Sequence, residues 1–100
     1  MGGGRSSPMT ELAKILQELT YGRGYTAEYV AAYIQRDLSF VRRCLHGEKR
    51  PSHATLILWA QAVTSDRTAY RRDKVGYPST LSRFVAAALA DAAVDLARKD

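Results

Sequence analysis

Glycine and proline residues interrupt the chain at short intervals, and their spacing constrains the fold more than any other feature of the sequence. Gly22 and Gly24 close a first apolar segment, Gly47 closes a later one, and Pro51 precedes another. Within these segments apolar residues recur every three or four positions, the period of an amphipathic helix. No segment alternates convincingly as a strand would, although residues 70–77 can hold a short extended piece. The sequence therefore predicts an all-α fold, a compact bundle of several helices.

Capping residues mark the starts of the first four expected helices. Ser7 ahead of Pro8 suits the first, Thr26 the second, Asp37 the third and Ser52 the fourth. Such short polar side chains are favoured there because they accept hydrogen bonds from backbone N–H groups that have no partner within the helix. The apolar residues at helical spacing behind these caps are predicted to be buried. They are Leu12, Ile15, Leu16, Leu19, Val30, Ala31, Ile34, Phe40, Val41, Cys44, Leu45, Leu56, Trp59, Ala60 and Val63.

The last part of the chain is predicted to end in one long helix. Residues 65–74 can form a short helix, 75–79 a loop, and 80–98 an alanine-rich helix with a continuous apolar stripe. The stripe can fold back on the domain's own core, but its length and small residues favour packing against a second chain, with Asp91 and Asp95 toward solvent. The residues predicted to form a dimer interface are Leu81, Val85, Ala88, Leu89 and Ala92.

Composition limits the class of protein. One hundred residues suffice for one domain. The net charge of +5 and the pI of about 9.7 favour a polyanionic partner, although many proteins without one are equally basic. A single cysteine excludes an intrachain disulfide and indicates a reducing, cytoplasmic setting. No apolar run approaches the roughly 18 residues of a membrane span. Residues 1–9 lack the apolar core of a signal peptide and are expected to form a flexible leader.

Five basic residues lie between positions 36 and 50, in and around the third expected helix. The same segment contains core residues, so this helix should be apolar on one face and arginine-rich on the other. Spacing alone does not distinguish an ordinary solvated face from a surface that contacts a polyanion. The five residues are Arg36, Arg42, Arg43, Lys49 and Arg50.

The stretch TAEYVAAYIQRDLSFVRRCLHGEKRPS, read as two helices and a turn, resembles the helix-turn-helix of the lambda-repressor and Cro-like family. In that family a small residue lets the two helices cross closely, and an apolar residue ten positions later anchors the second helix. A glycine and a basic loop then end that helix. Ala31, Val41 and Gly47 stand at these three positions. The resemblance covers residues 10–64, which are therefore expected to form a DNA-binding domain, and residues 65–100 a helical extension for dimerisation.

The turn departs from the family pattern. Gln35 stands where the family usually has glycine, and Arg36 stands where it has an apolar residue. Leu38 can replace that missing apolar anchor and face inward, or it can lie on the surface that meets DNA.

The resemblance implies that the third helix enters the major groove of double-stranded DNA. Arg43 is the strongest candidate for reading a base, because a guanidinium can bond to both O6 and N7 of guanine. Thr26, at a helix N-terminus, is expected to meet phosphate. The expected base contacts are Leu38, Ser39, Arg42 and Arg43, and the expected backbone contacts are Thr26, Arg36, His46, Lys49, Arg50 and Ser52.

Other residue types give no sign of catalysis. His46 and His53 have no cysteine or carboxylate at metal-ligand spacing, so no metal site is expected. No recognisable active-site motif is present, and no enzyme activity, cofactor, small-molecule substrate or membrane partner is predicted. Cys44 and Trp59 are interpreted as core residues. A second basic cluster is either a solvated face or a further DNA contact; it consists of Arg67, Arg71, Arg72 and Lys74.

The predicted function is a sequence-specific transcriptional regulator that binds double-stranded DNA as a homodimer. A small repressor of phage or bacterial type, occupying an operator in the cytoplasm or nucleoid, fits the size and charge. The alternative is a protein-interaction module, antitoxin-like or a phage accessory protein, whose helical scaffold binds a protein partner, because a fold alone does not decide function.

Overall fold

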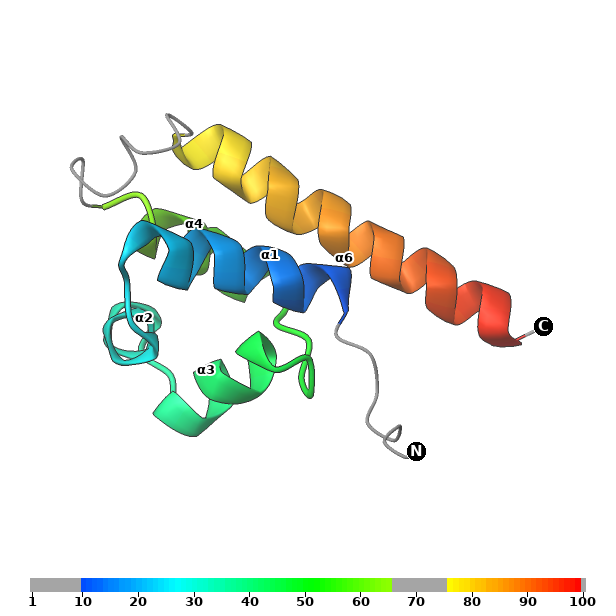
Figure 1. Ribbon diagram of the computed structural model, residues 1–100, viewed down its shortest axis with the longest axis horizontal. Coiled ribbons are helices and arrows are strands. Elements are labelled where there is room, and N and C mark those ends of the chain that lie inside the picture. The colour runs from blue at the N-terminus through cyan, green and yellow to red at the C-terminus, as the bar shows by residue number, and fades with distance from the viewer. Residues whose placement is uncertain (1–9, 66–75, 100) are drawn as a thin grey trace.

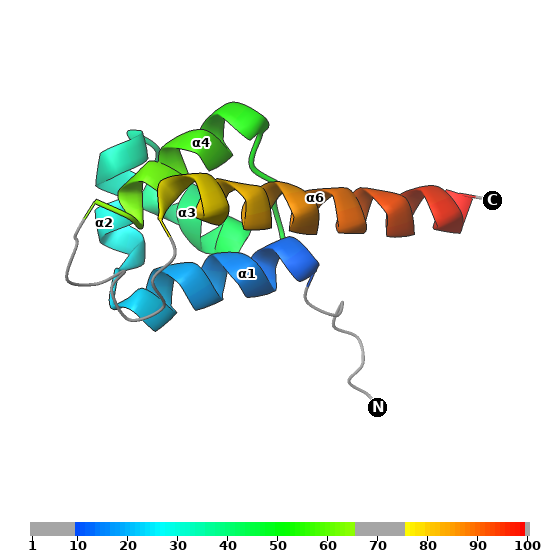
Figure 2. The same ribbon diagram turned by 90° about the horizontal axis from the view of Figure 1, so that it is seen from above.

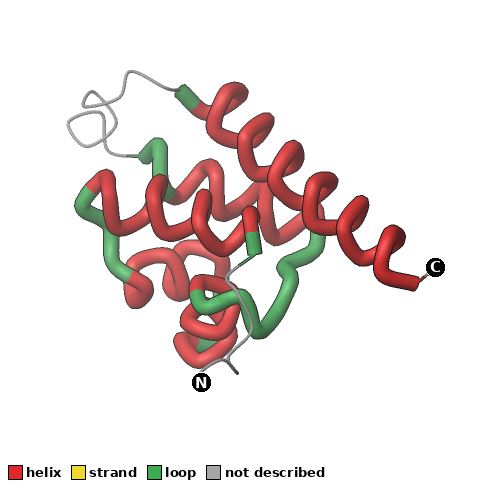
Figure 3. Tube along the Cα trace, turned by 45° about the vertical axis from the view of Figure 1, so that its right-hand side comes forward, coloured by secondary structure: helices red, strands yellow, loops and turns green. Residues whose placement is uncertain are grey.

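The structure is a computed structural model that describes residues 10–65 and 76–99, with side chains to residue 97 (Figure 1). Predictions for the leader, for a helix at 65–74 and for the second basic cluster therefore lie outside the described residues. The described part is helical and contains no strand, which confirms the all-α prediction (Figure 3). Its elements are α1 (Glu11–Thr20), the 3-10 turn η2 (Tyr21–Arg23), α2 (Ala27–Ile34), α3 (Leu38–Leu45), α4 (His53–Ala62) and α6 (Tyr77–Lys99).

Hydroxyl caps start three of the helices. Thr26 and Ser52 accept hydrogen bonds from the backbone N–H groups of the third residue beyond them, as predicted. The cap of the first helix was predicted wrongly as Ser7. Thr10 holds that position, because its hydroxyl accepts the Ala13 N–H at 3.1 Å and α1 begins at Glu11. Asp37 precedes α3 as expected, but its side chain makes no capping hydrogen bond.

The core consists largely of the residues that their spacing indicated. Val41, Leu56 and Trp59 are completely buried, and the Trp59 indole N–H donates to the Thr20 hydroxyl at 2.9 Å. Each such large side chain contributes about 1.5–3 kcal/mol by leaving water. Ile15 and Phe40 are only partly buried at the edge of this core.

Helix α6 begins earlier than predicted. It starts at Tyr77, so the loop expected over residues 75–79 was wrong for its last three positions. Pro78 is compatible with this start, because the first turn of a helix does not need the backbone N–H that proline lacks. At 23 residues the helix is about 35 Å long, and its last turns project beyond the other helices (Figures 1 and 2).

The first half of α6 belongs to the core. Phe84 is completely buried and Ala87 is 8% exposed, where α6 lies against α1 and α4. The predicted dimer stripe is consequently divided. Leu81 and Ala88 pack against the core, whereas Leu89 is 62% exposed. Val85 is half-buried and Ala92 is exposed.

Asp91 was predicted to face solvent, and this was wrong. Its side chain is buried against the start of α1, where its two carboxylate oxygens accept the N–H groups of Glu11 at 2.9 Å and Leu12 at 3.0 Å. The first N–H groups of a helix lack partners within it and form its positive end, so a carboxylate from another helix is stabilised there. Asp95 keeps a solvent-accessible side chain as predicted, but its carboxylate also accepts a hydrogen bond from Arg50, which the sequence did not predict.

Arg23 ties three elements together in the interior. It is 2% exposed, and its guanidinium donates to the Val63 carbonyl at 3.0 Å and to the Thr80 hydroxyl at 3.1 Å. These bonds join the 3-10 turn η2, the end of α4 and the start of α6. A buried charge is tolerated only with such partners.

Candidate nucleic-acid interface

Helices α2 and α3 are joined by a turn of three residues, Gln35 to Asp37. Gln35 adopts the left-handed conformation, with φ 58° and ψ 47°. Its N–H and that of Arg36 both donate to the Ala31 carbonyl and so close α2. This conformation costs a residue with a side chain about 1–2 kcal/mol and favours glycine, the residue usual at this position in the family that the sequence resembles. Gln35 therefore adopts, with a side chain, a conformation that favours glycine.

Helix α3 has one buried and one exposed face. Val41, Cys44 and Leu45 are at most 1% exposed and pack against the neighbouring helices. Ser39, Arg42 and Arg43 lie on the exposed face, with His46 just beyond the helix end. Leu38 is partly buried and packs against the core, which is the inward of its two predicted orientations. It leaves only part of its surface for a ligand.

The arginines near α3 differ in their surroundings. Arg42 forms an ion pair with Glu28 of α2, with an N–O distance of 3.4 Å and both side chains more than half exposed. Exposed pairs of this kind contribute about 0–1 kcal/mol, so Arg42 can leave Glu28 readily. Arg43 pairs with no carboxylate in the described part of the chain.

Arg36 covers an aromatic ring. Its guanidinium carbon lies 3.9 Å from the centre of the Phe40 ring, a cation–π contact worth about 0.5–1 kcal/mol at an exposed site. This contact accounts for an arginine at a position where the related pattern has an apolar residue. The aliphatic part and the planar head shield Phe40, while the charge stays at the surface.

The loop after α3 is anchored to α1 at one end. Gln17 of α1 donates its amide N–H to the Leu45 carbonyl at 2.6 Å. Gly47 has a φ of 82°, a left-handed conformation in which a side chain would be strained, although a Cβ there would meet only ordinary contacts at 3.6 Å. Lys49 and Arg50 follow in exposed positions.

The hydroxyls of Thr26 and Ser52 are engaged as helix caps. Each accepts a backbone N–H, and the Thr26 hydroxyl still has a proton to donate. The Ser52 hydroxyl also bonds to the Thr55 hydroxyl at 3.2 Å. The predicted phosphate contact at Thr26 is thus chemically compatible with capping, whereas a phosphate at Ser52 would share its hydroxyl with Thr55.

Cys44 is an inert thiol. Burial raises its pKa from 9.0 to about 11, although Arg36 and Lys49 act in the opposite direction. It remains protonated near neutral pH and has neither the charge nor the exposure of a nucleophile. Among residues 10–65 and 76–97, no three metal-ligating side chains gather. No helix within this part of the chain is long and apolar enough to cross a membrane.

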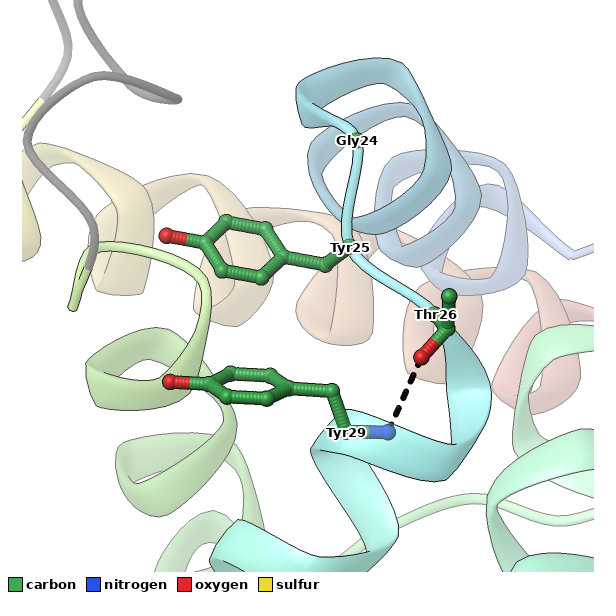
Figure 4. A pocket seen from close by; sticks show the side chains of 4 residues that line it. All are labelled: Gly24, Tyr25, Thr26 and Tyr29. Atoms are coloured by element: carbon green, nitrogen blue, oxygen red, sulfur yellow. Dashed lines mark hydrogen bonds between the residues drawn. The ribbon is translucent and has the colours of Figure 1, made fainter.

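A shallow hollow lies beside the start of α2. It measures about 250 Å³ and is lined by Gly24, Tyr25, Thr26 and Tyr29 (Figure 4). The rings of Tyr25 and Tyr29 are stacked with centroids 5.2 Å apart, and Tyr33 continues the row on the same helix. The four-residue spacing of these tyrosines was a signal in the sequence that the prediction did not use. Because the stacked rings already fill the space between them, they leave no slot for a third ring.

Comparisons with known protein families, curated proteins and solved structures find no match to this chain.

Proposed function

We propose that the protein binds double-stranded DNA with α3 in the major groove. The observation that carries this proposal is the division of α3 into a completely buried face and an exposed face with Ser39, Arg42 and Arg43. An α-helix is about 10–12 Å across with its side chains, and the major groove of B-DNA, about 12 Å wide, admits a single helix. The rigid burial of one face is what holds the other face at a fixed angle.

The proposed roles follow from exposure and chemistry. Arg43 reads guanine, Arg42 and Ser39 lie beside it, and Leu38 contributes an apolar edge. Charged and hydroxyl groups around the helix contact the phosphates: Thr26, Arg36, His46, Lys49, Arg50 and Ser52. Binding alone, without catalysis, is proposed.

We also propose that two chains associate through the outward face of α6. This face consists of Val85, Leu89, Ala92, Ala93, Leu96 and Ala97. Its larger members and Ala92 are spaced by four, three and four positions, as in the seam of a coiled coil. The aspartates within this range, Asp91 and Asp95, point toward the chain's own domain instead. An uncharged face can meet a copy of itself without repulsion between like charges, and its alanines permit close approach of two helices.

In this proposal the dimer presents two α3 helices to successive major grooves about 34 Å apart. A protein of this kind, in the cytoplasm or nucleoid, represses transcription by occupying a pseudo-palindromic operator. A second candidate is a module that binds another protein through the outward face of α6, since the same uncharged surface would serve either partner.

Fluorescence anisotropy of a labelled duplex, titrated over a range of salt concentrations, tests the DNA-binding proposal. We expect binding that weakens steeply with salt, by roughly 0.9 log units per log unit of salt for each phosphate contact. The double variant Arg42→Gln/Arg43→Gln tests whether DNA binds at α3. Both side chains are exposed, so their loss removes no core atom. Equal binding by this variant and the native chain would exclude α3 as the recognition helix.

A further inference from the structure

Arg50, at the end of the loop that follows α3, is bound by a carboxylate of α6. Its guanidinium donates to Asp95, 45 residues further along the chain. We propose that Asp95 competes with DNA phosphate for Arg50, so that the chain's own C-terminal helix restrains its affinity for DNA. The inference rests on the proposed function and adds an internal regulator to it.

The position of Asp95 is set by the turn of α6 before it. Asp91 is buried and bonded to the start of α1, which fixes α6 at this point against the domain. Asp95 follows one turn later on the same side of the helix, where its carboxylate accepts a hydrogen bond from Arg50 at the end of the loop between α3 and α4. The docking of α6 therefore places the Asp95 carboxylate within reach of the Arg50 guanidinium.

The pair is accessible to a competing anion. The side chains of Arg50 and Asp95 are 50% and 39% exposed, so a phosphate oxygen can approach the guanidinium. Exposed ion pairs are weak, whereas arginine forms strong, bidentate hydrogen bonds with phosphate. While Asp95 stays in place it neutralises Arg50 and repels an approaching phosphate.

The neighbouring lysine provides an internal contrast. Lys49 is exposed beside Arg50 and pairs with no carboxylate in the described part of the chain. In this loop Lys49 is therefore available to an anion without a competing carboxylate from the described residues, whereas Arg50 is already paired with Asp95 of α6. Release of Arg50 would add one phosphate contact to those that the loop makes without it.

The experiment compares Asp95→Asn with Glu18→Gln in binding to a non-specific duplex. Glu18 is the matched control, because it also forms an exposed ion pair with an arginine across the α1–α6 contact, at 2.9 Å from Arg83. Both changes raise the net charge by one unit. We expect Asp95→Asn to tighten binding about threefold to tenfold more than Glu18→Gln, and to steepen the salt dependence by roughly 0.9.

A background without the arginine identifies the mechanism. When Arg50→Gln is already present, adding Asp95→Asn should tighten duplex binding no more than Glu18→Gln does. If the gain persists there, or if Asp95→Asn binds no better than Glu18→Gln, the inference is wrong. Asp95→Ser should reproduce the result, and circular dichroism should show unchanged helix content for every variant. If the native chain itself fails to bind duplex DNA, the proposed function fails, a result distinct from native binding without the Asp95 effect.

Discussion

The contact between Asp91 and the start of α1 makes a quantitative prediction for stability. Replacing Asp91 with alanine removes the acceptor for two backbone N–H groups, of which that of Leu12 is buried and that of Glu11 partly buried. A buried N–H left without an acceptor costs about 1–3 kcal/mol. Loss of the carboxylate from the positive end of α1 adds about 0.3–1 kcal/mol, and up to about 2 kcal/mol in partly buried sites. We therefore expect Asp91→Ala to lower the free energy of unfolding by about 2–4 kcal/mol.

Urea and thermal unfolding, followed by circular dichroism, measure this loss. For a domain of this size each kcal/mol corresponds to about 4–8 °C, so the melting temperature should fall by roughly 10–30 °C. Asp91→Asn should lie between the native chain and Asp91→Ala, because its amide retains one acceptor oxygen. Glu18→Gln, which breaks only an exposed pair between the same two helices, should cost less than about 1 kcal/mol. A loss for Asp91→Ala no larger than that of the control would mean that water reaches these N–H groups and that α6 does not cap α1.

Further predictions concern the proposed interfaces and the buried thiol. Arg43→Ala should weaken binding to the preferred DNA site by about 1–3 kcal/mol and relax the preference at one base pair in a sequence-selection assay; an equal loss on all sequences would limit Arg43 to phosphate. Lys49→Gln should reduce the slope of log affinity against log salt by roughly 0.9, and an unchanged slope would place Lys49 away from the duplex. Leu89→Asp should yield a folded monomer in sedimentation at micromolar concentration, because a charge would be buried in the dimer at several kcal/mol; Leu58→Asp on α4 is the control, and a native monomer would refute the dimer. Cys44 should resist alkylation at pH 8 until the chain unfolds. Because its folded pKa of about 11 exceeds its ordinary value of 9.0, its contribution to stability is complete below pH 9 and is lost as pH rises toward 11, as unfolding titrations at those pH values would show.

Much of the fold could be predicted because its signals are local. The caps Thr26 and Ser52 and the buried residues of α2, α3 and α4 follow from spacing of three and four positions, which any amphipathic helix must show. The left-handed turn was indicated only by where Gln35 falls in the related pattern. No property of glutamine itself predicts that conformation.

The contacts of α6 could not be predicted in the same way. Asp91 and Asp95 look like surface residues in the sequence, because nothing near them indicates that the start of α1 and Arg50 would lie opposite. Their partners are 79–80 and 45 residues away, and only the packing of α6 brings these groups together. In the same packing Leu81 and Ala88, which were predicted to lie in the dimer interface, contact the chain's own core. Periodicity identifies an apolar face but not which part of it the chain covers by itself.

Selection of bound sequences from a random duplex pool tests the central claim most directly. The native chain at moderate salt should enrich a pseudo-palindrome whose half-sites are centred about one helical turn, 34 Å, apart and contain guanine at the position read by Arg43. The Arg43→Ala chain should recover a related motif in which that position is no longer fixed. Two results together, from a chain that is folded, would contradict the account. The pool would contain no enriched motif after repeated rounds, and the chain would bind the duplex pool no more strongly at low salt than at high salt.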